Sequence, residues 1–358
     1  MSVWVIVGGQ FGSEGKGKVA AYIARRERAD FCVRCGGPNS GHSITDAKGR
    51  TEVFRQLPTG VVADVPRLLI APGALIDPKV LKREIDHFGI MPGQLGVDRN
   101  CFMIEPSDRE NERNQNLRER LGSTLSGVGA ATSRRVMRSP DARTARNAAA
   151  DHPWLAPLLT DVSAELNRGV DNGKTTVIEG TQGFGLSLYH SDHFPKCTSR
   201  DTTASAFLSE AGLAPSCAEH VVLVLRTFPI RVPGNSGPLA AEMTWEQLQA
   251  ESGYPHPIGE VTSVTCLPRR VARFDWPLAR RAVAANRPTM IALNGLDYLR
   301  FSDRGVQSWD DLSTRSTLFV REIESELNVP VCVLGTGPGA KELFSLRAPA
   351  DTRQRVAS

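Results

Sequence analysis

The sequence predicts an α/β protein with a mostly parallel central β-sheet and helices on both of its faces. Residues 3–7 and 221–225 are apolar at every position, which is typical of parallel strands that are covered on both sides. Loops rich in Gly, Thr and Asn follow the expected strands, and helical segments alternate with them. The carboxyl ends of parallel strands meet at one edge of a sheet, so we expect a common site there.

The first expected strand runs directly into a glycine-rich turn at residues 8–18. This turn contains five glycines and two lysines, Lys16 and Lys18, and a helix is expected to begin near Lys16. Free N–H groups at such a helix start bind anions, and the lysines add positive charge, so the turn predicts a phosphate site. It is not a Walker A motif, because Gln10 replaces the first glycine and Gly17 replaces the Ser/Thr. A tight turn without a ligand is the alternative.

The other expected elements alternate along the chain. Further strands are expected at 30–34, 67–71, 175–179, 290–293 and 329–334. Helices are expected at 77–88, where Asp77-Pro78 is a typical start, at the strongly charged 105–120, and at 155–166. The polar stretch 140–150 is the expected flexible connection. We expect one domain over residues 1–345 and a C-terminal tail over 346–358.

Composition narrows the functional class. Hydrophobic residues make up 41% and charged residues 23% of the 358 positions, as in ordinary globular proteins. No run approaches the roughly 18 apolar residues of a membrane span, and no signal peptide is evident, so a cytoplasmic protein without a membrane partner is expected. The net charge of +4 is mild and the arginines are scattered, which argues against nucleic acid and suits small phosphorylated substrates.

The cysteines do not suggest a disulfide framework or a metal centre. There are seven, an odd number, and they are dispersed along the chain. Cys32 and Cys35 form a lone C-x-x-C without a second pair or a histidine at ligand spacing. We therefore expect the cysteines to be thiols of the core.

Four segments, taken together, resemble the adenylosuccinate synthetases: 9–18, 39–42, 180–183 and 265–270. The resemblance extends from residue 3 to about residue 340, and it implies a P-loop-related fold. It also implies a ligase that joins L-aspartate to C6 of a 6-oxopurine nucleotide, driven by a nucleoside triphosphate with Mg²⁺. In this family O6 is first phosphorylated and the phosphate is then displaced by aspartate, because an amide-like C6–O6 bond cannot be displaced directly.

The most informative departure from the family pattern is Ser13. The family uses an aspartate there as the base near N1, and a histidine, matched by His42, as a donor toward O6 and the γ-phosphate. Serine is not a general base at neutral pH without a partner. A phage branch of the family, from phages with 2-aminoadenine DNA, carries this change and converts dGMP to 2-amino-2′-deoxyadenylosuccinate. A small uncharged residue beside N1 and C2 leaves room for a 2-amino group. A viral protein of this kind is expected in the host cytoplasm.

Two further departures concern the sugar and the donor. The family's Thr-Gly-Arg-x-Arg-Arg loop reads here with Leu267 in place of the first arginine, and a leucine beside C2′ suits a deoxyribose. The family's Lys-x-Asp sequence, which reads guanine in GTP, keeps only Asp297 after Gly295 and Leu296. ATP or dATP is therefore the expected donor, with GTP possible.

The resemblance implies a role for each matching position. Catalytic roles fall to Ser13, His42 and Lys16, and Mg²⁺ ligands to Ser13 and the Gly41 carbonyl. The purine nucleotide is expected at Ser13, Asn39, Thr124, Gln182 and Thr198, with Arg138 reaching in from the second subunit of a homodimer. The triphosphate is expected at Gly12, Glu14, Gly15, Lys16, Gly17, Gly41, His42, Ser43, Arg269, Gly295, Leu296, Asp297, Gly335, Thr336 and Gly337. L-Aspartate is expected at Ser263, Val264, Thr265, Cys266, Leu267 and Arg269.

Three functions stay open at this point. The leading hypothesis is an ATP-dependent ligase that acts on dGMP and L-aspartate. The second is an ordinary adenylosuccinate synthetase that acts on IMP with GTP and tolerates Ser13. The third, motivated by the missing aspartate, is a nucleotide-binding pseudoenzyme without ligase activity.

Overall fold

The sheet that the sequence predicts is the centre of the fold. A computed structural model describes residues 2–45, 49–140, 142–262 and 266–346. Ten strands form the sheet in this spatial order: β17 (Leu343–Ser345), β16 (Val331–Gly335), β15 (Met290–Asn294), β11 (Ala218–Arg226), β1 (Ser2–Gly8), β10 (Thr175–Glu179), β2 (Phe31–Arg34), β5 (Arg67–Ile70), β7 (Leu95–Asp98) and β9 (Leu159–Thr160). Neighbouring strands are parallel except at the edge pair β16–β17. The predicted fold class is confirmed.

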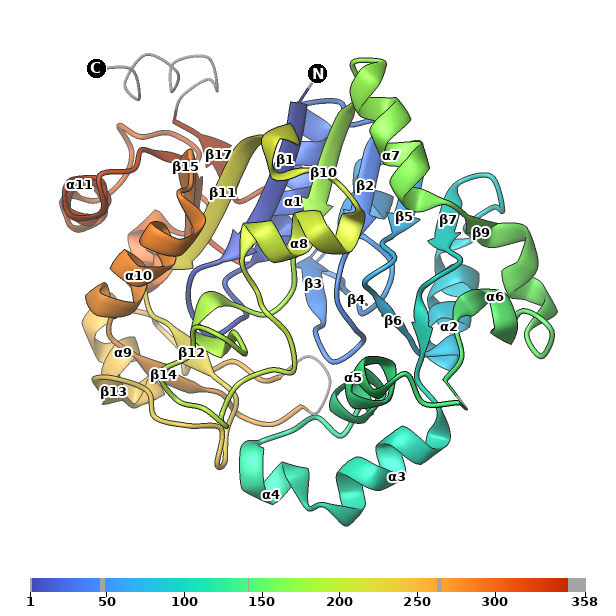
Figure 1. The fold of residues 1–358 in the computed structure, drawn as a ribbon. Coiled ribbons are helices and arrows are strands. Elements are labelled where there is room, and N and C mark those ends of the chain that lie inside the picture. The colour runs from blue at the N-terminus through green and yellow to red at the C-terminus, as the bar shows by residue number, and fades with distance from the viewer. Residues whose placement is uncertain (1, 46–48, 141, 263–265, 347–358) are drawn as a thin grey trace.

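Helices cover both faces of this sheet, because alternate residues of each strand enter different cores. Val3, Val5 and Val7 of β1 belong to one buried cluster, and Trp4 and Ile6 belong to another. The first cluster is covered by α7 (Val162–Asp171), α8 (Ala204–Ala211), α10 (Trp276–Asn286) and α11 (Thr314–Leu327), and the second by α1 (Lys16–Arg26) and α2 (Pro78–Phe88). Figure 1 shows α8 in front of the sheet and α1 behind it.

Smaller elements surround the carboxyl ends of the central strands (Figure 1). The short strands are β3 (His42–Thr45), β4 (Thr51–Phe54), β6 (Leu75–Ile76), β8 (Phe102–Met103), β12 (Ile230–Arg231), β13 (Glu242–Met243) and β14 (Arg270–Ala272). The remaining helices are α3 (Pro106–Asn114), α4 (Leu117–Leu121), α5 (Val128–Met137), α6 (Ala145–Ala148) and α9 (Trp245–Ser252). Short 3₁₀ turns occur at η1 (Thr59–Ala63), η2 (Pro153–Leu158), η3 (Phe184–Leu186), η4 (Pro215–Cys217), η5 (Leu296–Tyr298) and η6 (Phe301–Asp303).

Three expected segments differ in the structure. The charged helix expected at 105–120 is broken into α3 and α4, because Asn116 adopts a left-handed backbone conformation that ends the first helix. The helix expected at 155–166 is instead η2, β9 and the start of α7, since Pro157 interrupts the first part and the Asp161 side chain caps the second. The stretch 140–150 contains α6, whose Ala145 and Ala148 are buried.

The cysteines divide into two groups. All seven are free thiols. Cys32, Cys35, Cys101 and Cys332 are buried, as the sequence predicts, and burial raises the pKa of the Cys32 and Cys35 thiols. The prediction of core thiols is wrong for Cys266, which is exposed, and for the two half-buried cysteines, 197 and 217. In the part of the chain that the structure describes, no helix is both long enough and apolar enough to cross a membrane.

Candidate functional site

A cavity of about 810 Å³ opens where the loops after β1, β2 and β10 meet residues 231–236, 260–262 and 266–269. Most of the residues expected to bind substrates line this one cavity. They are Gly12, Ser13, Gly15, Lys16, Gly17, Asn39, Gly41, His42, Ser43, Thr124, Gln182, Thr198, Cys266, Leu267 and Arg269. Ser263, Val264 and Thr265, which were expected to bind L-aspartate, lie outside the described residues.

The backbone of the glycine-rich loop binds the carboxylate of Glu14, a residue of the same loop. Glu14 is 1% exposed, and its Oε1 accepts hydrogen bonds from the backbone N–H groups of Gln10 (3.1 Å) and Gly12 (2.8 Å). Its Oε2 lies 2.6 Å from Lys16 Nζ. Gly183 is required here, because a Cβ on it would come within 2.3 Å of Glu14 Oε1. The prediction that these loop N–H groups point at a phosphate is therefore wrong for Gln10 and Gly12.

The start of α1 keeps the properties of an anion site. Gly15 caps this helix with a left-handed φ of 96°, and no side chain in the described part of the chain caps the helix's first N–H groups. Those N–H groups carry the positive end of the helix dipole, which attracts phosphate. Lys16 and Gly17 both line the cavity at this point. The helix start, rather than the turn itself, therefore presents the N–H groups that the predicted phosphate site requires.

A buried network fixes His42 beside this helix start. Glu179 lies at the end of β10 and is fully buried. Its carboxylate accepts a hydrogen bond from Arg34 Nη1 at 2.6 Å and two from Thr59, one from the backbone N–H at 2.7 Å and one from the Thr59 hydroxyl at 2.8 Å. His42 Nδ1 also contacts Glu179 Oε1. The opposite ring nitrogen, Nε2, is buried and has no hydrogen-bond partner among the described residues. The His42 side chain itself lines the cavity. The carboxylate therefore orients the imidazole with Nε2 as the available atom.

Burial, together with the neighbouring Arg34 charge, keeps His42 neutral in the protein alone. Burial, and secondarily the nearby Arg34, lower its pKa to about 4, whereas the Arg34 guanidinium and His42 hold the pKa of Glu179 down at about 2 against its burial. With Nδ1–H donated to Glu179, Nε2 is then an acceptor. A phosphate against Nε2 would raise the pKa of His42, because a nearby negative charge favours the imidazolium. The donor role that the resemblance implies thus requires the anionic ligand.

The opposite side of the cavity is formed by residues 260–262 and 266–269. Arg226 pairs with Glu260 at 2.5 Å and donates a hydrogen bond from Nη1 to the Ser13 carbonyl at 3.2 Å. Arg269 donates from Nε to the Val261 carbonyl at 3.0 Å, and no carboxylate among the described residues forms an ion pair with it. Arg269 is therefore available to bind a carboxylate or phosphate of a ligand.

The segments 295–297 and 335–337, which were expected to bind the triphosphate, form a second cluster that does not line the cavity. The N–H of Gly295 donates to the Gly335 carbonyl at 3.0 Å, and Lys18 Nζ donates to the Gly337 carbonyl at 2.6 Å. The cluster touches the glycine-rich loop, since Asn294 Nδ2 donates to the Glu14 carbonyl at 2.8 Å. Asp297 is buried and accepts a hydrogen bond from the Tyr254 hydroxyl. Leu296 and Thr336 are fully buried, and the Thr336 hydroxyl donates a hydrogen bond to the Val306 carbonyl at 2.9 Å.

Arg138 lies outside the cavity of its own chain. It is exposed and follows the last residue of α5 in a left-handed conformation with φ of 52°. This placement is compatible with a contribution to a neighbouring subunit, and it excludes a contact with the cavity of the same chain in this conformation.

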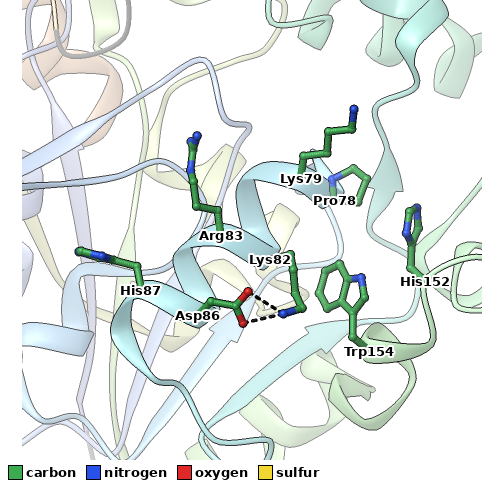
Figure 2. A pocket seen from close by; sticks show the side chains of 8 residues that line it. All are labelled: Pro78, Lys79, Lys82, Arg83, Asp86, His87, His152 and Trp154. Carbon is green, nitrogen blue, oxygen red and sulfur yellow. Dashed lines mark hydrogen bonds and ion pairs between the residues drawn. The ribbon is translucent and has the colours of Figure 1, made fainter.

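A second hollow of about 710 Å³ lies over α2 (Figure 2). It is lined by Pro78, Lys79, Lys82, Arg83, Asp86, His87, His152 and Trp154. Figure 2 shows Lys82 paired with Asp86, at 2.6 Å from both carboxylate oxygens. None of the residues expected to bind substrates lies there, so it is not the candidate site.

Sequence reasoning missed several residues of the site. Glu179 directly precedes the Gly180–Gly183 segment, and Arg34 ends the second strand, so their positions at strand ends were a usable signal. Glu112 lines the cavity and accepts from the N–H groups of Gly127 (2.8 Å) and Gly129 (2.9 Å). In the sequence Glu112 is one of many charged residues of the helix expected at 105–120. Its position against the start of α5 becomes evident only from the fold.

Comparison with known proteins agrees with this arrangement. The family model for adenylosuccinate synthetase matches residues 5–146 and 142–304. The adenylosuccinate synthetase of Thermococcus onnurineus is 39% identical over 352 residues, 97% of this chain and 99% of that protein, and that of Archaeoglobus fulgidus is 36% identical over 349 residues with the same coverage. The chain belongs to the adenylosuccinate synthetase family. Adenylosuccinate synthetases are ligases that form a C–N bond, and this protein is therefore such a ligase.

Two solved structures of different family members are similar to this protein. The succinoaminodeoxyadenylate synthetase of cyanophage S-2L, bound to dGMP and to dATP as an energy donor, superposes with a TM-score of 0.81 at 27% identity and covers 99% of this chain and 98% of that one. The fully ligated adenylosuccinate synthetase of Plasmodium falciparum has a TM-score of 0.86 at 20% identity, with 97% and 100% covered. The second likeness shows the fold alone.

Proposed function

We propose that this ligase joins L-aspartate to C6 of dGMP, with ATP or dATP as donor, and yields 2-amino-2′-deoxyadenylosuccinate. The observation that carries the proposal is Ser13. It lines the cavity in the glycine-rich loop, at the position where the family resemblance implies an aspartate. The likeness to the cyanophage enzyme, whose structure holds dGMP and dATP, supports the same choice of substrates.

Ser13 is held in place while its hydroxyl stays available. Its backbone has a left-handed φ of 59°, and its carbonyl accepts from Arg226. The hydroxyl has no hydrogen-bond partner among the described residues and is exposed to the cavity. A hydroxyl can accept a hydrogen bond from a purine 2-amino group, whereas an aspartate would fill the same space with a larger, charged side chain.

The reaction requires two transfers at C6. In the first, O6 attacks the γ-phosphorus of the triphosphate, the nucleoside diphosphate leaves, and the purine loses its N1 proton. In the second, the aspartate amine attacks C6, the C6–O6 bond breaks, inorganic phosphate leaves and the amine loses a proton. The products are the succinylated nucleotide, a diphosphate and phosphate. We assign no residue as the acceptor of the N1 proton.

The cavity offers a group for each charge that develops. His42 Nε2 lies beside the helix start where phosphate is expected, and its protonated form donates to the oxygens of the transferring phosphoryl group. Lys16 and the first N–H groups of α1 attract the same phosphates. Arg269 is placed to bind a carboxylate of aspartate, as its free guanidinium suggests. These roles are proposals that rest on the geometry of the empty cavity walls.

The family implies Mg²⁺ with the triphosphate. In the described ranges, no group of three or more His, Cys, Asp or Glu side chains could hold a metal ion. Nucleotide-bound Mg²⁺ takes many of its ligands from phosphates and water, so few protein ligands are needed. The Ser13 hydroxyl and the Gly41 carbonyl are oxygen donors on the cavity wall and fit such an ion. When bound, Mg²⁺ would neutralise phosphate charge.

An ordinary adenylosuccinate synthetase that uses IMP is the second candidate. It is favoured by the archaeal relatives, of which eight are 34–39% identical and span nearly the whole chain. To decide, the purified protein is incubated with Mg²⁺, ATP, L-aspartate and either dGMP or IMP, and the succinylated products are measured by mass spectrometry. We expect product from dGMP at a kcat/KM at least tenfold that of IMP. Product from IMP but not from dGMP would refute the proposal.

The donor is tested in the same assay with ATP, dATP and GTP. The Asp297 carboxylate is already bound by the Tyr254 hydroxyl, and neither Gly295 nor Leu296 supplies the family's lysine charge beside it. We therefore expect ATP and dATP to support turnover better than GTP. A preference for GTP would show that Asp297 is released to read guanine.

We also propose a homodimer in which Arg138 serves the partner's cavity, since Arg138 does not line its own. Arg138→Ala and His42→Ala variants, each inactive alone, are mixed after mild dissociation. Half of the mixed dimers' sites would then combine intact residues from both chains, so activity should return. Failure to recover activity, with subunit exchange verified, would remove the shared site.

A further inference from the structure

Arg231 is a buried arginine in the wall of the substrate cavity. It ends β12, lines the cavity and is only 1% exposed. Its Nη1 donates to the Pro238 carbonyl at 2.7 Å and its Nη2 to the Lys196 carbonyl at 2.8 Å. The guanidinium lies 4.5 Å from the centre of the Phe11 ring, which also lines the cavity. Carbonyls and an aromatic face thus hold the group in one position.

No acid compensates this charge. Among the described residues no carboxylate forms an ion pair with Arg231, and its Nε is buried without a partner. Its cross-strand neighbour on β14 is another arginine, Arg270, whose own charge is met by Glu242 at 2.7 and 2.5 Å. Burial, and then Arg270, lower the pKa of Arg231 to about 10, so it is charged at neutral pH.

An uncompensated buried charge is costly. The penalty for burying an ion is several kcal/mol unless an opposite charge and hydrogen bonds offset it. The two carbonyls and the Phe11 ring offset part of this penalty through dipoles and a cation–π contact. They supply no negative charge. The cavity is the remaining place from which a negative charge can come.

We propose that Arg231 provides the counter-charge for an oxyanion of a bound substrate, either the 5′-phosphate of the purine nucleotide or a carboxylate of the amino acid. The proposal rests on the proposed function only in that both substrates are anions. Segments 196–198 and 232–238 are tied to Arg231 by its two carbonyl contacts, and Thr198, Val232 and Pro233 from them line the cavity. Arg231 is a binding residue, and it takes no part in proton or phosphoryl transfer.

The test compares two variants of the full-length protein that differ in charge. Arg231→Lys and Arg231→Gln each keep a donor for a carbonyl, but only lysine keeps the positive charge. KM for the nucleotide and for L-aspartate, kcat and Tm are measured for both. We expect Arg231→Gln to raise the KM of one anionic substrate at least tenfold with a smaller change in kcat, and Arg231→Lys to restore most of it. Arg273→Gln is the control, because Arg273 is exposed and pairs with Glu251 far from the cavity wall.

The substrate whose KM rises identifies the oxyanion: the nucleotide indicates the phosphate, and aspartate indicates the carboxylate. Unchanged KM values, or equal impairment of the lysine and glutamine variants, would overturn the proposal, because the carbonyl contacts alone would then explain Arg231. Salt provides a second measurement. Raising the ionic strength should increase the KM of that substrate less for the wild type, whose guanidinium is buried, than for Arg231→Lys, whose flexible charge is more exposed to counterions and is screened more; identical salt dependence would count against the proposal.

Failure of this inference is distinguishable from failure of the dGMP proposal. If the wild type uses IMP and not dGMP, the substrate proposal is wrong, and the Arg231 comparison is carried out with IMP, which has the same 5′-phosphate. If no succinylated product forms from either purine, binding of the two nucleotides to wild type and variants is measured by calorimetry. Equal affinity of wild type and Arg231→Gln for both nucleotides and for aspartate would then overturn the role of Arg231 alone.

Discussion

The two walls of the substrate cavity are built in opposite ways. The wall formed by the glycine-rich loop and β10 contains Glu14, His42 and Glu179, which are at most 6% exposed and are tied to backbone or charged partners. The facing wall, residues 260–262 and 266–269, exposes apolar side chains: Val261 is 56% and Leu267 45% exposed. Arg269 on this wall has no acidic partner among the described residues.

This contrast suggests to us a division of roles: one wall carries the groups expected to act in the reaction, and the other carries the groups expected to select the substrate. Groups that must meet developing charge are fixed in advance, which lowers the reorganisation needed during the reaction. The groups that we expect to choose among sugars and amino acids are exposed side chains of the facing wall, such as Leu267, which lie outside its buried Arg226–Glu260 pair, so substitutions there cost little folding free energy. The comparison predicts that variants of the first wall change stability and rate together, whereas variants of the second change selectivity alone.

Glu179→Gln should produce the largest effect. The substitution leaves the buried Arg34 charge without its carboxylate and removes the acceptor that orients His42. Breaking a buried ion pair in this way costs about 3–5 kcal/mol of unfolding free energy, and we expect kcat to fall by about 100-fold or more, the size of a typical general acid–base contribution. Urea unfolding and steady-state kinetics measure the two effects. Glu165→Gln, which breaks the partly exposed pair with Arg67, is the control and should cost about 0–1 kcal/mol. Wild-type stability of Glu179→Gln would contradict the contrast between the walls.

Lys18 should make stability depend on alkaline pH. Burial lowers its pKa to about 8 from 10.5. Between pH 8 and 10.5 the unfolded chain therefore binds more protons than the folded protein, and the free energy of unfolding attributable to Lys18 rises with pH in that window. We expect a gain on the order of 1–3 kcal/mol between pH 7.5 and 9.5 relative to Lys18→Met. The exposed Lys79→Met variant should follow the wild type, and a Lys18→Met curve parallel to wild type would contradict the expected burial cost.

Ser13→Asp should change the choice of purine. The carboxylate would occupy the space proposed for the 2-amino group and supply the base that the family otherwise uses. We expect the ratio of kcat/KM for IMP to that for dGMP to rise at least tenfold, about 1.4 kcal/mol of transition-state discrimination. Ser13→Ala keeps the space and should retain the preference for dGMP. An unchanged ratio in Ser13→Asp would mean that another part of the cavity reads the purine.

Sequence patterns were sufficient for the central sheet because its strands are buried on both faces. The apolar stretches at 3–7 and 221–225 could only be strands of that kind, and β1 and β11 contain them. Three strands of the sheet, β7, β9 and β17, were missed, because β9 and β17 have only two and three residues and the four-residue β7 contains Gly96 and ends in Asp98. The helices expected at 105–120 and 155–166 failed where single residues, Asn116 and Pro157, decide the backbone.

The candidate site was predictable as a set of loops and less so as a network. The motif residues Asn39, His42, Gln182 and Thr198 do meet in one cavity. The sequence gives no sign that the loop N–H groups bind Glu14, because that contact depends on how the turn closes on itself. Nor does it indicate the isolated charge of Arg231, which follows from the pairing of β12 with β14 across the 38 residues of chain between Arg231 and Arg270.

Leu267→Arg should have the smallest effect and test the second wall alone. An arginine beside the proposed deoxyribose would offer donors to a 2′-hydroxyl, so we expect the kcat/KM of GMP relative to dGMP to rise about three- to tenfold, the value of one added hydrogen bond. Because Leu267 is exposed, the free energy of unfolding should stay within about 0.5 kcal/mol of wild type. Val261→Arg adds the same charge at another exposed, cavity-lining position and should leave the sugar preference unchanged. If both variants shift the preference equally, the effect is general electrostatics and Leu267 does not select the sugar. If Leu267→Arg instead lowers stability by several kcal/mol, the second wall is as preorganised as the first.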